Sequence, residues 1–191
     1  MDDSAYFYTL QMEARRRTIH AIHRRIQVSG NIKQWDKLTL CSILGRDIGD
    51  ALEFARVEWP KYYGPDTHEG LNMDWERVVK ARSVDPDHFN LAIWQEIDGV
   101  NILVAMAIGN PSHGRNHLTV KWIERFYGHN YLGGRALWPI LTCAEEYAKL
   151  LGAQRVLIKD PVDSRKYGRY GYADYIHPNV KHGGCYMEKE F

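Results

Sequence analysis

The sequence has no long hydrophobic run and few cysteines. No apolar stretch approaches the ~18 to 20 residues that a bilayer crossing needs, and the amino terminus is acidic, without the apolar core of a signal peptide. The three cysteines, Cys41, Cys143 and Cys185, are widely spaced, which argues against a disulfide framework and provides no zinc-binding spacing. These absences predict a protein without a membrane or metal partner, in a reducing, cytoplasmic compartment.

Two nucleotide-binding motifs are also missing. GxxxxGK[ST] does not occur, which argues against a P-loop, and GxGxxG does not occur, which argues against a Rossmann fingerprint. Repeats and low-complexity segments are absent as well. The chain has 191 residues, of which 45% are hydrophobic and 26% charged, and this composition suits one globular domain of ordinary size.

A net charge of only +1 conceals a local basic cluster near the amino terminus. Between residues 14 and 33 there is no acidic side chain, and the basic ones are Arg15, Arg16, Arg17, Arg24, Arg25 and Lys33. Such a cluster can bind a nucleic acid or another anionic partner, or it can be the solvated face of a helix. The same helix can pack on its own domain or form a homodimer, and these alternatives stay open.

Hydrophobic periodicity and turn residues predict an α/β chain. Asp98-Gly99 between two β-rich runs is a strong hairpin signal, and Asp74 is a candidate helix N-cap. We expect helices over 4–28, 46–59, 75–82 and 134–152 and a short one within 162–172. The expected strands are 37–44, 89–97, 100–109, 117–126, 153–160, 173–178 and 183–191.

The short connections around helix 134–152 favour a parallel, right-handed crossover from strand 117–126 to strand 153–160. The three strands 89–97, 100–109 and 117–126 are expected to run in antiparallel succession, and 173–178 and 183–191 can form a last pair. The predicted fold is therefore a mixed, mostly antiparallel sheet with one parallel β-α-β crossover. We expect residues 1–36 to form an N-terminal helical extension and residues 37–191 to form the main domain.

Two adjacent glycines, Gly133 and Gly134, lie at the entrance of this crossover. A glycine-rich loop after a strand can aim consecutive N–H groups at one point, and the following helix adds unpaired N–H groups and the positive end of its dipole. Arg135 can supplement those amides. The junction is either an anion site or a plain turn, and the glycines alone do not decide between them.

The segment from these glycines to KYGRYGY resembles the GNAT N-acetyltransferase superfamily. The resemblance covers roughly 37–191 and is most specific from 117 to 172. Tyr167, Gly171 and Tyr172 match the Tyr, Gly and aromatic positions of N-x-x-A-x-x-L-Y-x-x-x-G-F, whereas Asp160 and Asp163 replace its Asn and Ala. The pyrophosphate loop of the family, R/Q-x-x-G-x-G/A, aligns with His129-Asn130-Tyr131-Leu132-Gly133-Gly134, or one residue later so that Asn130 comes first.

The resemblance implies an acyltransferase that moves an acetyl or related acyl group from acetyl-CoA, or another acyl-CoA, to an amine. The acceptor is a small molecule, a peptide or a nucleic acid. Tyr167 is then the general acid for the leaving thiolate, or it simply packs in the core. Glu124 is the candidate base, or an ordinary carboxylate paired with Arg125 or Lys121. His113 and His117 are secondary bases.

The same resemblance implies where the ligands bind. A backbone amide around Glu124 to Phe126, at a bulge that separates two parallel strands, is expected to polarise the thioester. The expected donor-binding residues are Arg125, Phe126, His129, Asn130, Tyr131, Leu132, Gly133, Gly134, Arg135 and Asp160. The acceptor pocket is expected at Trp59, Tyr62 and Tyr63, with Asp66, His68 and Glu69 beside them. The alternatives are an idle GNAT-fold binding module, or a nucleic-acid-modifying or nucleic-acid-binding protein that docks through residues 14–33.

Overall fold

The computed structural model describes residues 3–30, 35–64, 73–178 and 183–191. Its helices are α1 (Asp3–Ser29), α2 (Ala51–Val57), the 3-10 turn η1 (Trp59–Tyr62), α3 (Trp75–Arg82), α4 (Leu137–Leu150) and α5 (Ser164–Gly168). Its strands are β1 (Leu38–Cys41), β2 (Phe89–Ile97), β3 (Val100–Pro111), β4 (His117–Arg125), β5 (Arg155–Lys159), β6 (Ala173–Tyr175) and β7 (Tyr186–Glu190).

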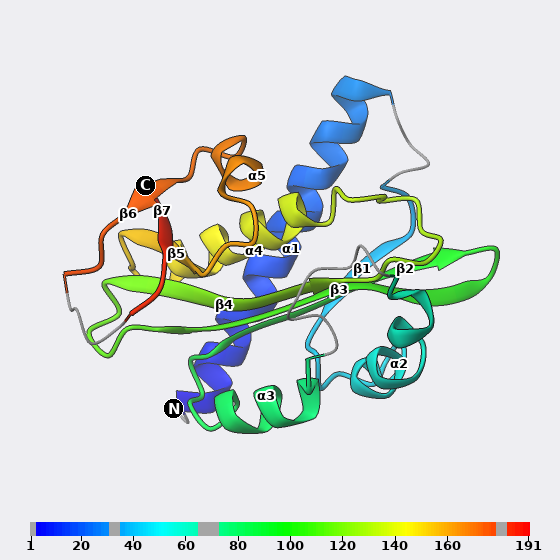
Figure 1. The fold of residues 1–191 in the computed structure, drawn as a ribbon, viewed down its shortest axis with the longest axis horizontal. Coiled ribbons are helices and arrows are strands. Elements are labelled where there is room, and N and C mark those ends of the chain that lie inside the picture. Colours follow the sequence, from blue (N-terminus) through cyan, green and yellow to red (C-terminus); the bar gives the residue numbers. More distant parts are fainter. Residues whose placement is uncertain (1–2, 31–34, 65–72, 179–182) are drawn as a thin grey trace.

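The strands form one sheet in the order β1-β2-β3-β4-β5-β7-β6. Every neighbouring pair is antiparallel except β4 and β5, which run parallel on either side of the crossover helix α4. Helices α1, α4 and α5 lie on one face of the sheet, and α2 and α3 lie on the other (Figure 1). The predicted mixed sheet with a single parallel crossover is confirmed.

The sheet separates two apolar cores. Side chains of a strand alternate between its faces, so Leu91 and Ile93 of β2 pack towards α1 and α4, whereas Ala92 and Trp94 pack towards α2 and α3. Both faces of the central strands are therefore covered. This explains why the β2 and β3 segments are almost continuously apolar instead of alternating with polar residues.

Two helices begin later than their periodicity predicts. The helix expected over 46–59 begins at Ala51 because the Asp50 carboxylate accepts a hydrogen bond from Glu53 N at 3.0 Å, and Trp59–Tyr62 forms a separate turn. The helix expected over 134–152 begins at Leu137 because Gly133 and Gly134 have φ values of +52° and +51°. Left-handed residues cannot continue a right-handed helix.

Helix α1 packs on its own chain. Its Ala14 and Ile22 belong to the core on the α4 side of the sheet. Arg15 is also buried, and its Nη2 donates to the Asn90 carbonyl at 3.0 Å and to Gln11 Oε1 at 3.1 Å. The division into 1–36 and 37–191, and a homodimer through α1, stay predictions. No helix in the described part of the chain, α1 included, has the length and apolarity that crossing a membrane requires.

Candidate active site

Strands β4 and β5 separate partway along β4. They pair only from His117 to Val120, and the last pair joins Val120 to Ile158. Beyond that pair β4 continues for another five residues to Arg125, whereas β5 ends at Lys159. The edge of β4 that faced β5 is therefore open over its second half.

A β-bulge lies at the point where the strands part. Ile108 of β3 stands opposite Trp122, but the next residue of β3, Gly109, stands opposite Val120, so Lys121 is an extra residue on β4. A Cβ on Gly109 would overlap the backbone of β4, so only glycine permits this approach. The bulge is predicted by the resemblance, but it lies at Lys121 rather than around Glu124 to Phe126.

A cavity of about 420 Å³ fills the opening between the separated strands. Strand β4 lines it from Val120 to Arg125, and the chain around the end of β5 and α5 forms a second wall that ends at Tyr167. The remaining lining residues come from the chain after β4, the start of α4 and the chain before α3: Tyr127, Gly134, Ala136, Leu137, Ile140 and Met73.

Two backbone amides of β4 face this cavity. Phe126 N donates to the Val104 carbonyl at 2.8 Å, so that amide points towards β3. Amide directions alternate along a strand, which aims the amides of Ile123 and Arg125 at the side vacated by β5. Phe126 itself is buried, and its ring packs against Tyr62 with centroids 4.9 Å apart. An acyl donor in the opening would therefore meet Ile123 and Arg125 rather than the Phe126 amide.

Tyr167 reaches the cavity from α5. Helix α5 begins after Asp163, whose carboxylate accepts from Arg165 N and serves as its N-cap. The Tyr167 ring is buried, yet its hydroxyl has no hydrogen-bond partner within the described ranges. Burial raises the pKa of Tyr167 to about 12. A phenol with that pKa keeps its proton at neutral pH and is free to donate it.

The Glu124 side chain is hydrogen-bonded by residues that lie on the α2 and α3 face of the sheet. It is only 4% exposed. The Tyr63 hydroxyl donates to Oε1 at 2.5 Å, and the indole Nε1 of Trp75 donates to Oε2 at 2.6 Å. Two neutral donors thus orient the carboxylate at the cavity, and the expected pairing with Arg125 or Lys121 is replaced by bonds to a tyrosine and a tryptophan. Trp75 was not anticipated, because nothing local marks a tryptophan at a helix start as a partner for a distant strand.

The glycine junction uses some of its amides in hydrogen bonds within the protein. Tyr131 N donates to Gln95 Oε1 at 3.0 Å, Gly133 N donates to Asn130 Oδ1 at 2.9 Å, and Arg135 N donates to the Leu132 carbonyl at 3.0 Å. Gly134, Ala136 and Leu137 line the cavity, and their amides have no hydrogen-bond partner in the described part of the chain. The unpaired amides of the junction therefore lie at the last glycine and the start of α4, not along the whole loop.

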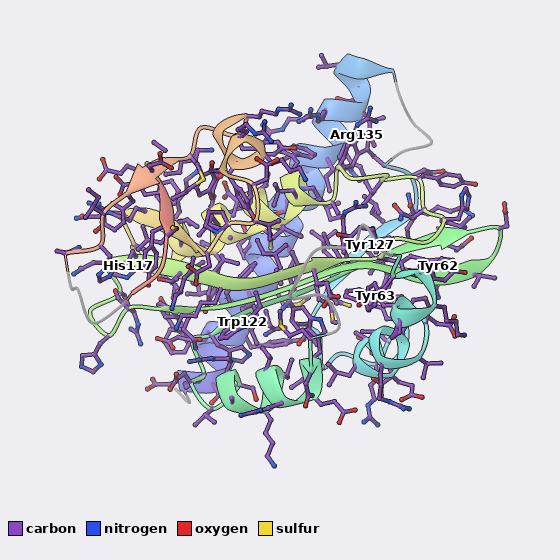
Figure 2. The ribbon with its side chains drawn as sticks, viewed as in Figure 1. Tyr62, Tyr63, His117, Trp122, Tyr127 and Arg135 are labelled. Carbon is purple, nitrogen blue, oxygen red and sulfur yellow. The ribbon has the colours of Figure 1, made fainter. Side chains whose placement is uncertain are left out.

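The other loop residues point elsewhere. Leu132 is fully buried in the core, and His129 is exposed with its ring 5.7 Å from that of Tyr131. Arg135 is exposed at the surface (Figure 2). Asp160 lines the cavity, but its carboxylate accepts from Cys185 N at 2.9 Å and so also fixes the start of β7.

The expected acceptor residues divide between core and surface. Trp59 is fully buried, and its Nε1 donates to the Leu103 carbonyl at 3.1 Å, so it is a core residue and not a pocket wall. Tyr62 is half exposed, and Tyr63 holds Glu124. Asp66, His68 and Glu69 lie outside the described residues.

The secondary bases do not reach the cavity. His113 is in the turn between β3 and β4. His117 begins β4, opposite Arg155, at the end of the strand farthest from Arg125 (Figure 2). The pattern of charged and apolar residues along this strand is too weak to show, from the sequence, at which of its ends β4 and β5 separate.

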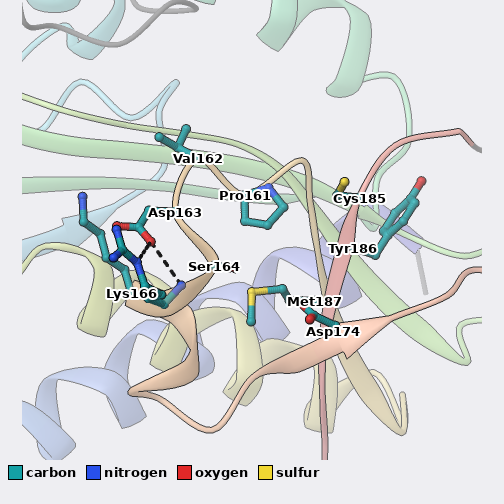
Figure 3. Close-up of a pocket in the computed structure, with 10 residues that line it drawn as sticks. Pro161, Val162, Asp163, Ser164, Lys166, Asp174, Cys185, Tyr186 and Met187 are labelled. Atoms are coloured by element: carbon teal, nitrogen blue, oxygen red, sulfur yellow. Dashed lines mark hydrogen bonds and ion pairs between the residues drawn. The ribbon is translucent and has the colours of Figure 1, made fainter.

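A second and larger hollow of about 580 Å³ lies on the other side of α5 (Figure 3). It extends from Pro161 to the start of β7, and the segment from Val162 to Lys166 contributes to both cavities. Neither Tyr167 nor Glu124 lines it. The candidate chemistry therefore belongs to the smaller cavity.

The basic cluster on α1 is engaged in part. Arg15 is buried, as described above. Arg16 and Arg17 both pair with Glu13, at 2.7 and 2.8 Å, and the guanidinium of Arg25 lies 4.4 Å from the Trp138 ring. Lys33 is outside the described residues. Arg24 is exposed, and neither Arg24 nor Arg25 forms an ion pair within the described ranges, so part of the positive charge of this helix remains available to an anionic partner.

Neither a protein-family model nor a curated protein matches the chain. Solved structures do. A spermidine N-acetyltransferase chimera from Vibrio cholerae is 14% identical, with 81% of this chain and 96% of that chain covered and a TM-score of 0.53. A protein from Desulfovibrio desulfuricans assigned to the GNAT family of acetyltransferases is 14% identical, with coverages of 80% and 98% and a TM-score of 0.52.

The chain has the GNAT fold. A nucleotide-linked sugar GNAT also matches it, at 13% identity, coverages of 81% and 87% and a TM-score of 0.50. These identities establish the GNAT fold alone, because one fold hosts many activities. The features that bear on activity are the bulge at Lys121, the opening beside it, and Glu124 and Tyr167, which both line that opening.

Proposed function

We propose that this protein transfers an acyl group from an acyl-CoA, acetyl-CoA in the simplest case, to an amine. The observation that carries the proposal is the opening between β4 and β5, which Tyr167 borders on the α5 side and Glu124 on the α3 side. A narrow opening between strands suits an extended thioester chain, whose polar groups can pair with the unpaired strand edge.

In the proposed reaction the neutral amine attacks the thioester carbonyl. A C–N bond forms, the C–S bond breaks, and the electron pair leaves with sulfur. Tyr167 gives its proton to the departing thiolate, and Glu124 receives the proton that the amine loses, directly or through water. The amides of Ile123 and Arg125 are placed to stabilise the oxyanion of the tetrahedral intermediate.

The donor phosphates are proposed to bind at the start of α4. The amides of Gly134, Ala136 and Leu137 are the donors left there, and the positive end of the α4 dipole adds to them. Asn130 and Gln95 act indirectly, because they hold the loop in the conformation that exposes Gly134.

The acceptor is proposed to be an amine of a small molecule, a peptide or a nucleic acid that enters from the α3 side, where Tyr63 and Tyr127 pack with ring centroids 6.4 Å apart. The possible homodimer through α1 has no part in this site.

Calorimetric titration and thermal unfolding with CoA, acetyl-CoA and longer acyl-CoAs test the proposal. A ligand that binds only the folded state raises the melting temperature by mass action. We expect one-to-one binding, followed by release of free CoA thiol when an amine mixture is added, and a lower release rate in Glu124→Gln. Absence of binding for every acyl-CoA would end the proposal.

A catalytically idle binding module is the second candidate. It is favoured by one observation: three amides of the glycine junction are already satisfied within the protein. Stoichiometric CoA binding with no thiol release for any amine would support this module, whereas turnover would exclude it.

A further inference from the structure

Three basic side chains gather on the α3 side of the cavity without an acidic partner. Arg82 comes from the end of α3, Lys121 from the bulge, and Lys159 from the end of β5. Lys121 and Lys159 line the cavity itself. None of the three forms an ion pair within the described ranges.

Trp122 holds two of these charges together. The Arg82 guanidinium lies 4.8 Å from the centre of its ring, and Lys121 Nζ lies 6.0 Å from it. Arg82 Nε is buried and has no hydrogen-bond partner in the described part of the chain. Burial, and then the charges of Arg82 and Lys159, lower the pKa of Lys121.

Such an arrangement is unfavourable without a ligand. Like charges repel, and a buried guanidinium N–H without an acceptor costs free energy. An anion placed beside Trp122 would remove both penalties. Its negative charge would offset the repulsion between the basic side chains, and one of its oxygens would accept a hydrogen bond from Arg82 Nε.

We propose that Arg82, Lys121 and Lys159 form a subsite for a carboxylate or phosphate group carried by the amine acceptor. The inference rests on the proposed acyl transfer, and it narrows the acceptor to a small molecule with an amine at one end and an anionic group at the other.

The spacing along β4 between the anion subsite at Trp122 and the proposed base Glu124 sets the length of that acceptor. Trp122 and Glu124 are two residues apart and both face α3, since Trp122 packs in the core on that side and Glu124 bonds to Trp75. Two strand residues span about 7 Å. An acceptor whose amine reaches Glu124 therefore carries its anionic group several bonds away, as in a longer ω-amino acid or an aminoalkyl phosphate.

Matched pairs of acceptors test the subsite: 4-aminobutyrate against butylamine, and 3-aminopropyl phosphate against propylamine. We expect the anionic member of each pair to have the higher kcat/KM, by about tenfold or more. Arg82→Gln and Lys121→Gln should remove that advantage, and Arg82→Lys should retain part of it. Lys80→Gln is the matched control, because Lys80 is exposed on the same helix.

A second arm needs no turnover. Inorganic phosphate is titrated by calorimetry into the wild type and the same variants, at constant ionic strength, both without CoA and with saturating CoA. We expect Arg82→Gln to weaken phosphate binding about tenfold and Lys80→Gln to leave it unchanged. Circular dichroism and the melting temperature verify that each variant is folded.

The outcomes separate the two proposals. If acyl-CoA fails to bind but phosphate binding depends on Arg82, the acyl transfer is wrong and the anion subsite stands. If acyl transfer proceeds and the anionic acceptors keep no advantage, or keep it in Arg82→Gln, the subsite is wrong. Phosphate binding that depends on Arg82 and disappears when CoA is present assigns the cluster to the donor and also overturns the proposal.

Discussion

The indole nitrogen of Trp75 lies 2.6 Å from the carboxylate of Glu124, although the two residues are 49 positions apart in the chain. Trp75 is the first residue of α3, and Glu124 is near the end of β4. The orientation of the proposed base therefore depends on how α3 packs on the sheet. Any change that displaces α3 should alter chemistry in the cavity as well as stability.

Trp75→Phe and Glu124→Gln should be coupled in stability. Trp75→Phe leaves Glu124 Oε2 without that donor, and Glu124→Gln leaves one acceptor oxygen where Tyr63 and Trp75 both donate. Each change costs about 1–3 kcal/mol, whereas the double variant loses the shared bond only once. Urea unfolding of both single variants and the double variant measures the coupling, which we expect to exceed about 1 kcal/mol. Additive effects would show that the bond contributes nothing to stability.

Tyr167→Phe should slow acyl transfer without weakening donor binding. Loss of a general acid typically costs about 10² to 10⁴ in rate, and the phenyl ring still fills the same part of the core. Thiol release under saturating acyl-CoA measures the rate, and calorimetry measures donor affinity. Tyr170→Phe is the control, since Tyr170 is a neighbouring, half-buried tyrosine that does not line the cavity. An unchanged rate in Tyr167→Phe would remove the general acid from the mechanism.

The raised pKa of Tyr167 also predicts a loss of stability at alkaline pH. Its folded pKa of about 12 lies above the ordinary value of 10.0, so the unfolded chain gives up this proton first as the pH rises. The stabilisation is complete below about pH 10 and falls as the pH approaches 12. Between about pH 8 and pH 11 the wild type should lose about 1 kcal/mol more than Tyr167→Phe.

Urea unfolding at the two pH values measures this difference. Burial also raises the pKa of Tyr147 and of Tyr172, but both proteins contain those residues, so their contributions cancel in the comparison. Equal losses in the two proteins would mean that the Tyr167 hydroxyl is as well solvated in the folded chain as in the unfolded one.

Gly109→Ala should damage the bulge and therefore the cavity. The added Cβ meets the β4 backbone, which cannot move aside as a flexible side chain would. We expect a cost of about 1–3 kcal/mol together with weaker acyl-CoA binding. Gly168→Ala is the matched control: a Cβ there meets nothing within 4 Å, and alanine has the higher helix propensity. Wild-type donor affinity in a folded Gly109→Ala protein would separate the bulge from donor binding.

Local sequence determined much of the fold. Asp98 and Gly99 both have positive φ, at 51° and 81°, as the predicted primed turn requires. Asp74 caps α3 by accepting from Arg77 N, and Gly152 ends α4 with a φ of +79°. Each of these features depends on one or two residues and the backbone beside them, so each can be read from the chain without knowing its neighbours in space.

The site depended on contacts between distant segments. The extra residue at Lys121 exists only relative to the register of β3, and the Tyr131 amide is occupied by Gln95, which belongs to β2. Trp59, which the aromatic loop suggested for the acceptor, lies in the core.

By itself, then, the sequence determined the order of elements, the parallel crossover and the position of Tyr167, because periodicity, turns and motif spacing are local. Only the tertiary structure decided where the strands part, which loop amides stay unpaired, and that Glu124 meets Trp75. Register, burial and hydrogen-bond competition between segments are properties of the packed chain.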